Sequence, residues 1–235
     1  MAYTSHLIPV EAVRLLVFDL DGTLIDSRQD LVNSVNATLC HLNRPELPEG
    51  VIASYIGDGA GMLVRRALGD PDDEAYVDTA LTYFLDYYRV HKLDFTHVYP
   101  GVIESLEALR LDADGGVRKM AVLTNKPVNP SRAICDALGL SPYFFQIYGG
   151  NSFPTKKPDP QGLNALIREA GVDPFETVMI GDSDIDVLTA RSSGAWAVGC
   201  RFGLAPHTLD AAEPDCLVDL PADWTDALDT ARIGT

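Results

Sequence analysis

Short apolar runs that end in polar or acidic residues recur along this chain and limit the folds that it can adopt. Helical patterns separate most of these runs; residues 160–171 (PQGLNALIREAG), for example, predict a helix that starts at Pro160 and stops at Gly171. Strands that are continuously apolar and alternate with helices indicate a parallel sheet covered on both faces. We therefore expect an α/β fold whose strands include RLLVFD at 14–19, KMAVLTN at 119–125, TVMIGD at 177–182, WAVGC at 196–200 and CLVDL at 216–220.

The segment from about residue 28 to residue 95 has a different pattern. Its apolar residues recur at helical spacing, and it contains no convincing strand. An all-helical insert directly after the first strand of an α/β domain is typical of a lid or cap, although the same periodicity also fits helices that merely pack on the core. We expect a core domain of residues 1–27 and 96–235 and a helical cap domain of residues 28–95.

The composition is that of an ordinary globular protein, with 46% hydrophobic and 22% charged residues among 235. Because 34 acidic residues outnumber 18 basic ones, for a formal charge of −16, we expect no nucleic-acid partner. No run approaches the roughly 18 apolar residues of a membrane span, and residues 1–13 lack the basic start and apolar core of a secretory signal. The four cysteines have no paired spacing, so we expect reduced, mostly buried thiols in a cytoplasmic protein. We take the protein to be a monomer or homodimer.

Polar side chains follow three of the predicted strands, and one further loop carries two lysines. The strands end in DLDGT (19–23), LTNK (123–126) and GDSDID (181–186), and TKKPDP (155–160) leads into the next helix. In a doubly wound sheet, ligands bind at the carboxyl ends of the strands. We therefore expect one site that contains Asp19, Asp21, Thr124, Asn125, Lys157, Asp182 and Asp186.

Such a set of residues suits phosphate chemistry. Carboxylates surrounded only by oxygen ligands favour Mg²⁺, a hard cation that keeps waters and often bridges to a substrate phosphate. Lysine, threonine and asparagine can bind phosphate oxygens. Uncatalysed hydrolysis of a phosphate monoester needs acceleration by as much as about 10²¹, whereas general acid catalysis supplies only about 10² to 10⁴. A nucleophile, a metal, a cation and an acid must therefore act together, and these loops can supply all four.

A DxDG pattern alone is weak, because a second copy occurs at residues 112–115. That copy follows a helical pattern and precedes a strand, so we expect a turn that does no chemistry. The first copy is not a calcium loop either. Counted from Asp19, its sixth position is Leu24, where such a loop needs glycine.

In their order along the chain, DLDGT, LTNK, KKPDP and GDSDID resemble the four motifs of the haloacid dehalogenase superfamily, over essentially the whole sequence. The resemblance implies a Rossmann-like core with a helical cap inserted after the first strand. It implies that Asp19 is the nucleophile that becomes an aspartyl phosphate. It also implies that Asp21 protonates the leaving oxygen and later activates water, and that its backbone carbonyl joins Asp19 and Asp182 in holding Mg²⁺.

The same resemblance implies roles for the other motif residues. Thr124 and Asn125 bind the phosphoryl group, and Lys157 neutralises this group and steadies Asp19. Asp186 lies one helical turn beyond the metal ligands. We expect it behind them or as an occasional direct ligand.

The carboxylate at Asp21 favours phosphatases and phosphomutases, because the dehalogenases, phosphonate hydrolases and ion-pumping ATPases of the superfamily lack it. Residues 55–68 (YIGDGAGMLVRRAL) and 98–109 (VYPGVIESLEAL) are similar to bacterial phosphoglycolate phosphatases. This similarity implies that the substrate is a small phosphorylated metabolite, with 2-phosphoglycolate as the first candidate. Sugar-phosphate phosphatases, pyrophosphatases and β-phosphoglucomutases share the cap type and stay open as alternatives. The intact motifs disfavour a protein that binds without catalysing.

Residues of the cap have two interpretations each. Arg65 and Arg66 either reach a substrate carboxylate or lie on the outer face of a cap helix. Gly57 and Gly59 either close over the site or simply allow a tight turn. We expect Lys156 to be a solvated or helix-flanking charge and the histidines to be structural.

Overall fold

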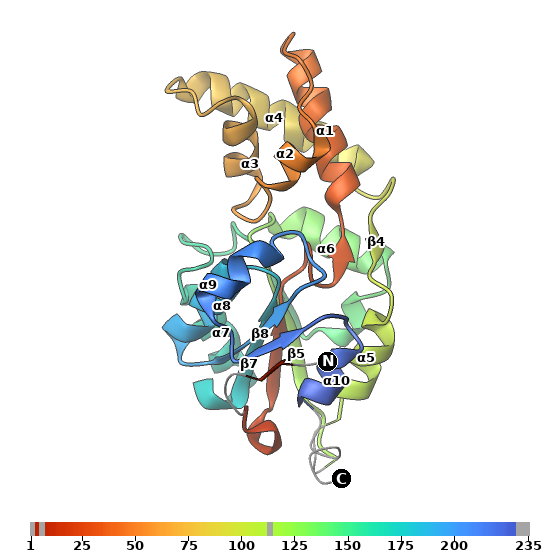
Figure 1. The fold of residues 1–235 in the computed structure, drawn as a ribbon, viewed down its shortest axis with the longest axis vertical. Helices are drawn as coiled ribbons and strands as arrows, with labels where there is room; N and C mark the ends of the chain where they lie inside the picture. The colour runs from red at the N-terminus through yellow and green to blue at the C-terminus, as the bar shows by residue number, and fades with distance from the viewer. Residues whose placement is uncertain (1–2, 5–7, 112–114, 229–235) are drawn as a thin grey trace.

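The computed structural model describes residues 3–4, 8–111 and 115–228. Within that part, seven strands form a sheet in the order β1-β9-β8-β7-β2-β5-β6, and every neighbouring pair is parallel except β1 with β9 (Figure 1). The strands are β1 (Tyr3–Thr4), β2 (Leu15–Phe18), β5 (Lys119–Leu123), β6 (Gln146–Tyr148), β7 (Thr177–Gly181), β8 (Trp196–Cys200) and β9 (Cys216–Val218). The predicted α/β fold with a parallel sheet is confirmed. Residues 112–114 of the second DxDG copy lie outside the described residues.

Strand β2 lies between β5 and β7 near the middle of the sheet, and its side chains are buried on both faces. Leu16 and Phe18 belong to one apolar cluster, whereas Leu15 and Val17 belong to a second cluster on the opposite face. All four side chains are fully buried. This explains the continuous apolar run, because alternate residues of a strand point to opposite faces of the sheet.

Helices cover both faces of the sheet (Figure 1). The cluster around Phe18 is completed by α5 (Val102–Leu109), α6 (Val128–Ala137) and α10 (Asp223–Leu228). The cluster around Val17 is completed by α7 (Gln161–Ala170), α8 (Asp184–Ser193) and α9 (Leu209–Ala212). Helix α7 lies where the sequence predicts it, and Gly171 ends it in the left-handed conformation with a φ of 69°.

The structure adds strands that the apolar runs do not reveal. Strand β6 has only three residues, and its first and last side chains, Gln146 and Tyr148, are half-buried. Two further short strands, β3 (Ile25–Asp26) and β4 (His97–Val98), pair antiparallel outside the main sheet. Segments this short and this polar do not produce a recognisable strand pattern.

Helices α1 (Arg28–His41), α2 (Glu49–Ala53), α3 (Ala60–Ala67) and α4 (Glu74–His91) lie between β3 and β4 and pack around their own apolar cluster, above the sheet in Figure 1. The expected helical cap is therefore present. The buried Asp30 carboxylate accepts hydrogen bonds from the backbone N–H groups of Phe95 and Thr96 and from the Thr96 hydroxyl. Asp30 thus joins the two segments that connect cap and core. The domain boundaries at residues 28 and 95 stay a prediction.

The cysteines are free in the described structure: Cys135, Cys200 and Cys216 are buried and Cys40 is exposed. None of the described helices has both the length and the apolar character that a membrane crossing requires.

Candidate active site

Three neighbouring strands bring the predicted site residues together. In the order β7-β2-β5, Asp182, Asp19 and Thr124 each follow the last residue of a strand. The Asp19 N–H continues the ladder by donating to the Ile180 carbonyl of β7 over 2.8 Å. Because parallel strands end at the same edge of the sheet, the side chains that follow them gather at one place.

A buried lysine joins the first and the last of the four motifs. The Lys157 ammonium lies 2.7 Å from Asp19 Oδ1 and 2.6 Å from Asp186 Oδ1. Burial alone would lower the pKa of Lys157, but the Asp186 and Asp19 carboxylates hold that pKa above its usual range. Lys157 is therefore a fixed positive charge beside the Asp19 carboxylate.

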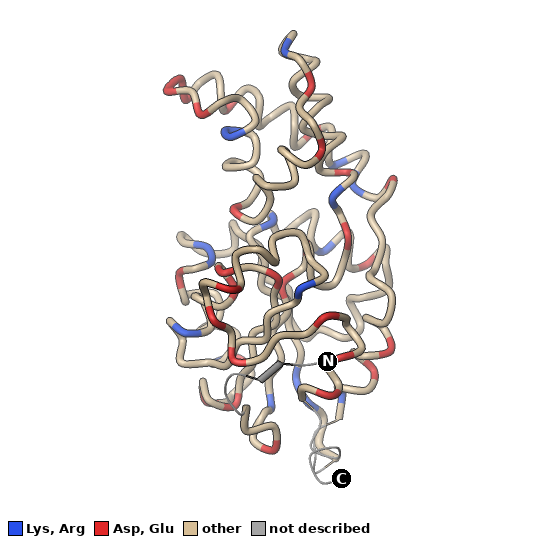
Figure 2. The backbone as a smooth tube through the Cα atoms, viewed as in Figure 1, with Lys and Arg blue, Asp and Glu red and all other residues tan. Residues whose placement is uncertain are grey.

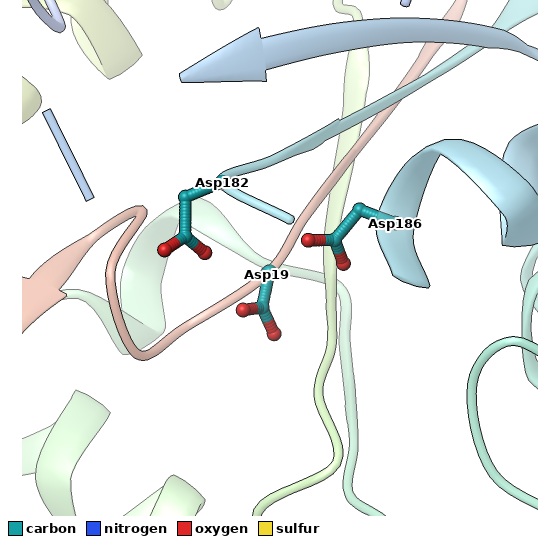
Figure 3. A group of neighbouring side chains, drawn as sticks. All are labelled: Asp19, Asp182 and Asp186. Carbon is teal, nitrogen blue, oxygen red and sulfur yellow. The ribbon is translucent and has the colours of Figure 1, made fainter. Parts of the chain in front are cut away.

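Asp19, Asp182 and Asp186 form a cluster in which one carboxylate oxygen of each lies within 4.8 Å of the others (Figure 3). Burial raises the pKa of Asp19 to about 6, although Lys157 opposes the shift. Burial, together with the two neighbouring carboxylates, raises the pKa of Asp182 to about 8. A nearby cation, or a proton on one of the carboxylates, relieves the repulsion between buried carboxylates at this spacing. Since every donor atom is oxygen, the cluster suits a hard divalent cation.

Both carboxylate oxygens of Asp186 already accept hydrogen bonds. Oδ1 accepts from Lys157, and Oδ2 accepts from the Ser183 hydroxyl over 2.7 Å and from the Ser183 N–H over 3.2 Å in a capping box at the start of α8. These contacts favour the placement of Asp186 behind the metal ligands, one of the two placements that the sequence leaves open.

Asp182 is fixed by backbone donors and enclosed by glycines. Its Oδ2 accepts from the N–H groups of Leu204 and Ala205 over 2.6 and 3.0 Å. A Cβ atom added at Gly22 would lie 2.3 Å from Oδ2 of this carboxylate, and one at Gly203 would lie 2.4 Å from it. The glycine of the DLDGT motif is therefore required by the close approach of Asp182 as well as by its φ of 90°. Gly203 stands outside the four motifs, so sequence reasoning missed it.

Asp21 forms an ion pair with Lys126, a residue that sequence reasoning also missed. Lys126 Nζ lies 2.8 and 2.9 Å from the two carboxylate oxygens of Asp21, and the Ser27 hydroxyl donates to Oδ1 over 2.5 Å. The Asp21 side chain is not one of the three clustered carboxylates. The predicted metal ligation by the Asp21 backbone carbonyl stays a prediction.

The motif residues after β5 contact the cap. Asn125 Nδ2 donates to the Gly57 carbonyl over 3.2 Å and to the Lys157 carbonyl over 3.0 Å. Asn125 Oδ1 is buried and has no hydrogen-bond partner among the described groups, whereas Thr124 Oγ1 accepts from the Lys126 N–H. Asn125 thus connects the loop that carries Lys157 with the cap loop.

The cap loop around Gly57 and Gly59 lies against the core, as the functional interpretation of these glycines predicts. A Cβ atom at Gly59 would lie 2.8 Å from the Asn125 carbonyl. Lys156 is exposed, but its ammonium also donates to the Asp58 carbonyl in this loop. Lys156 is therefore more than a solvated charge.

The two cap arginines are engaged inside the cap. Arg65 pairs with Glu74 over 2.5 Å, and Arg66 pairs with Asp58 over 2.5 Å. Neither lines the cavity described below. The structural interpretation of both arginines is the one that the geometry supports. His41 of the cap stacks on the ring of Tyr83, a contact that fits the structural role expected for the histidines.

A cavity lies between the strand ends and the cap. The cap contributes an almost wholly apolar wall of Leu31, Ile56, Leu63, Phe84, Leu85 and Tyr88. The core contributes the polar residues of all four motifs, and Lys126 and Lys157 are the cations among the described lining residues. Elsewhere in the described structure, Lys and Arg positions are scattered over both core and cap (Figure 2).

We expect Asp182→Asn to remove stabilisation by a divalent cation without weakening the metal-free protein. An amide oxygen can still accept from the Leu204 and Ala205 N–H groups, while one buried negative charge is lost. With chelator, the variant is expected to unfold at the same or a higher denaturant concentration than the wild type. With magnesium chloride at one hundred times its dissociation constant, only the wild type gains about 2.7 kcal/mol in free energy of unfolding. An equal gain in the variant would show that the cation binds elsewhere.

Residues 16–200 match the model of the haloacid dehalogenase-like hydrolases. The phosphoglycolate phosphatase of Pseudomonas putida is 39% identical over 93% of this chain and 81% of its own length. That of Neisseria meningitidis is 39% identical over 89% of this chain and 91% of its own length.

Solved structures agree with the sequence comparison. The crystal structure of a predicted phosphoglycolate phosphatase from Haemophilus somnus has a TM-score of 0.84 and 33% identity, and the match covers 92% of this chain and 97% of that one. This chain belongs to the haloacid dehalogenase-like hydrolase family.

Proposed function

We propose that this chain is a Mg²⁺-dependent phosphatase that hydrolyses a small phosphate monoester, and that 2-phosphoglycolate is its substrate. One observation carries the proposal: the Asp19 carboxylate lies 2.7 Å from a buried lysine and beside two further carboxylates, at a cavity between core and cap. The proposed substrate is supported by the names of two relatives that are 39% identical to this chain over 226 and 217 aligned residues. We also propose a cytoplasmic monomer or homodimer without a nucleic-acid partner.

In the proposed reaction, an Asp19 oxygen attacks phosphorus while the bond from phosphorus to the ester oxygen breaks. Asp21 gives its proton to the departing oxygen, so that glycolate leaves as the alcohol. Asp21 then takes a proton from a water molecule, the water oxygen attacks the aspartyl phosphate, and inorganic phosphate leaves with Asp19 restored. Splitting the displacement into two steps lets one carboxylate act first as an acid and then as a base.

The chain's other residues hold the reactants. Lys157 stays positively charged against Asp19 and is available to the phosphoryl oxygens, and Thr124 and Asn125 flank the same space. Asp19, Asp182 and the Asp21 carbonyl would hold Mg²⁺, which would neutralise part of the phosphoryl charge. The raised pKa values of Asp19 and Asp182 support the proposal that this donor set binds a cation.

The cavity wall favours a small leaving group over a sugar. Sugar hydroxyls need hydrogen-bond partners when they are buried. Among the described cap side chains that line the cavity, Tyr88 is the one with a polar atom. A hexose would therefore leave most of its hydroxyls unpaired against Leu31, Leu63 and Phe84.

The test is a comparison of kcat/KM for 2-phosphoglycolate, glucose 6-phosphate, a nucleoside monophosphate and pyrophosphate, with Mg²⁺ and with chelator. We expect 2-phosphoglycolate to be hydrolysed fastest, with glycolate and free phosphate as products. We expect chelator to reduce the rate by at least about 10²-fold, because the phosphoryl charge then lacks its neutralising partner. Inactivity towards the whole panel would overturn the phosphatase proposal, and preference for a hexose phosphate would overturn the substrate alone.

A further inference from the structure

We infer that Lys126 of the core and Tyr88 of the cap together bind the carboxylate of the substrate and so select phosphate esters of 2-hydroxy acids. This inference rests on the proposed function and names the residues that recognise the leaving group. Lys126 stands in the LTNK motif beside the two proposed phosphoryl-binding residues. Tyr88 comes from helix α4, and both side chains line the cavity.

Lys126 holds a positive charge at the leaving-group side of the site. It is 6% exposed, and its Nζ is 2.8 Å from Asp21 Oδ1, the carboxylate proposed to protonate the leaving oxygen. The same Nζ is 4.6 Å from the centre of the Tyr88 ring, which covers it on the cap side. Burial alone would lower the pKa of Lys126, but the Asp21 carboxylate holds that pKa above its usual range.

The other cation that lines the cavity is already assigned. Lys157 lies between Asp19 and Asp186 at 2.7 and 2.6 Å and serves the phosphoryl end of the substrate. The cap arginines Arg65 and Arg66 pair with acidic residues of the cap and do not line the cavity. Of the two cations among the described lining residues, Lys126 is therefore the one that can bind a second negative group on the substrate.

Tyr88 supplies an independent observation that points to a ligand. The side chain is 3% exposed, and its hydroxyl has no well-formed hydrogen bond to any described group, although Lys126 lies near enough to interact with it. Burial raises the pKa of Tyr88 to about 12, although the nearby Lys126 charge opposes this, so the hydroxyl keeps its proton and can donate. A buried hydroxyl without a well-formed hydrogen bond is destabilising. A bound acceptor such as a carboxylate oxygen would remove that destabilisation.

The covalent geometry of 2-phosphoglycolate fits these positions. One carbon separates its carboxylate from the ester oxygen, so the carboxylate lies next to the atom that Asp21 must protonate. Lys126 is within hydrogen-bond distance of Asp21 and has three donors, so one can stay on Asp21 while another binds the substrate. An uncharged group in place of the carboxylate would gain no ion pair with Lys126.

The experiment compares two substrates that differ at this group, 2-phosphoglycolate and 2-hydroxyethyl phosphate, in the wild type, Lys126→Met and Tyr88→Phe. The readout is the ratio of the two kcat/KM values. We expect Lys126→Met to lower this preference for the carboxylate by roughly 10- to 150-fold, the range for a hydrogen bond to a charged group. We expect Tyr88→Phe to lower it within the same range, because its hydroxyl donates to the same carboxylate. Most of the loss should appear in KM for 2-phosphoglycolate.

Two residues outside the cavity lining provide matched controls. Lys156→Met makes the same change at an exposed lysine, which binds the Asp58 carbonyl and does not line the cavity. Tyr87→Phe removes the hydroxyl of the adjacent tyrosine, whose ring stacks near His91 instead. We expect both controls to keep the wild-type ratio.

Each alternative outcome is distinct. Equal losses on both substrates would overturn the inference and reduce Lys126 to a residue that positions Asp21. A wild type that hydrolyses both substrates equally well would also overturn it, while the phosphatase proposal would stand. A wild type inactive on both would overturn the proposed function itself. Tyr88→Phe removes one atom from the side chain and therefore carries the test even if Lys126→Met does not fold.

Discussion

Asp19→Asn is expected to abolish turnover of 2-phosphoglycolate while the protein stays folded. An amide oxygen can still accept the hydrogen bond from Lys157, which spans 2.7 Å in the structure, but it is too weak a nucleophile to attack phosphorus. Loss of a covalent nucleophile costs at least about 10⁴-fold in kcat. Steady-state kinetics and thermal unfolding of the same preparation measure both effects.

A matched control uses the other copy of the DxDG pattern. Asp112→Asn makes the same chemical change at a position that we expect to do no chemistry, so it should keep wild-type kcat. Substantial activity in Asp19→Asn, or a comparable loss in Asp112→Asn, would remove Asp19 from the role of nucleophile.

Lys157→Met is expected to lower both stability and activity. The lysine is 5% exposed and pairs with two buried carboxylates, Asp19 and Asp186. Its removal leaves these charges uncompensated, which costs about 3–5 kcal/mol in free energy of unfolding of the metal-free protein. Activity should fall as well, because the phosphoryl group loses a fixed positive charge. Denaturant unfolding in chelator and kcat/KM with Mg²⁺ measure the two losses.

Lys156→Met is the control for this substitution, because the two lysines are adjacent in sequence and differ in burial. The exposed Lys156 is expected to change stability by no more than about 0.5 kcal/mol. If the two variants had equal stability, the ion pairs of Lys157 would contribute nothing to the folded state.

The sheet could be predicted because its central strands are buried on both faces. Leu15, Leu16, Val17 and Phe18 are all apolar for that reason, and the polar residue that follows, Asp19, marks the edge where the site lies. The same reasoning applies to β5 and β7. Strand β6 escaped prediction because three residues with Gln146 at the start carry too little apolar pattern.

The site could be predicted only as far as its motifs extend. Lys126 stands inside LTNK, yet no local pattern says that its ammonium reaches Asp21, which lies 105 residues earlier in the chain. From the sequence, Lys157 is expected beside Asp19, and no lysine is assigned to the Asp21 side chain. In the structure each has a separate lysine, Lys157 for Asp19 and Lys126 for Asp21. Long-range pairing of this kind depends on how the loops fold over the strand ends.

The sequence predicts that the cap is a helical insert, but it does not predict which cap side chains line the cavity. Helical spacing identifies the apolar residues, whereas the choice of Tyr88 for the cavity and of Arg65 for a pair with Glu74 depends on how the helices pack. Substrate selection depends on those contacts.

The most direct test of the account is acid-quench trapping of the phosphorylated enzyme. Asp21→Asn is mixed with p-nitrophenyl phosphate, whose leaving group departs without a proton, so that the first step proceeds and the second, which needs Asp21 as a base, slows. We expect the mass of one phosphoryl group on the peptide that contains Asp19, removable by hydroxylamine as an acyl phosphate and absent from a variant that also carries Asp19→Asn. A phosphoryl group on another residue, or none at any quench time while the substrate is consumed, would contradict the account.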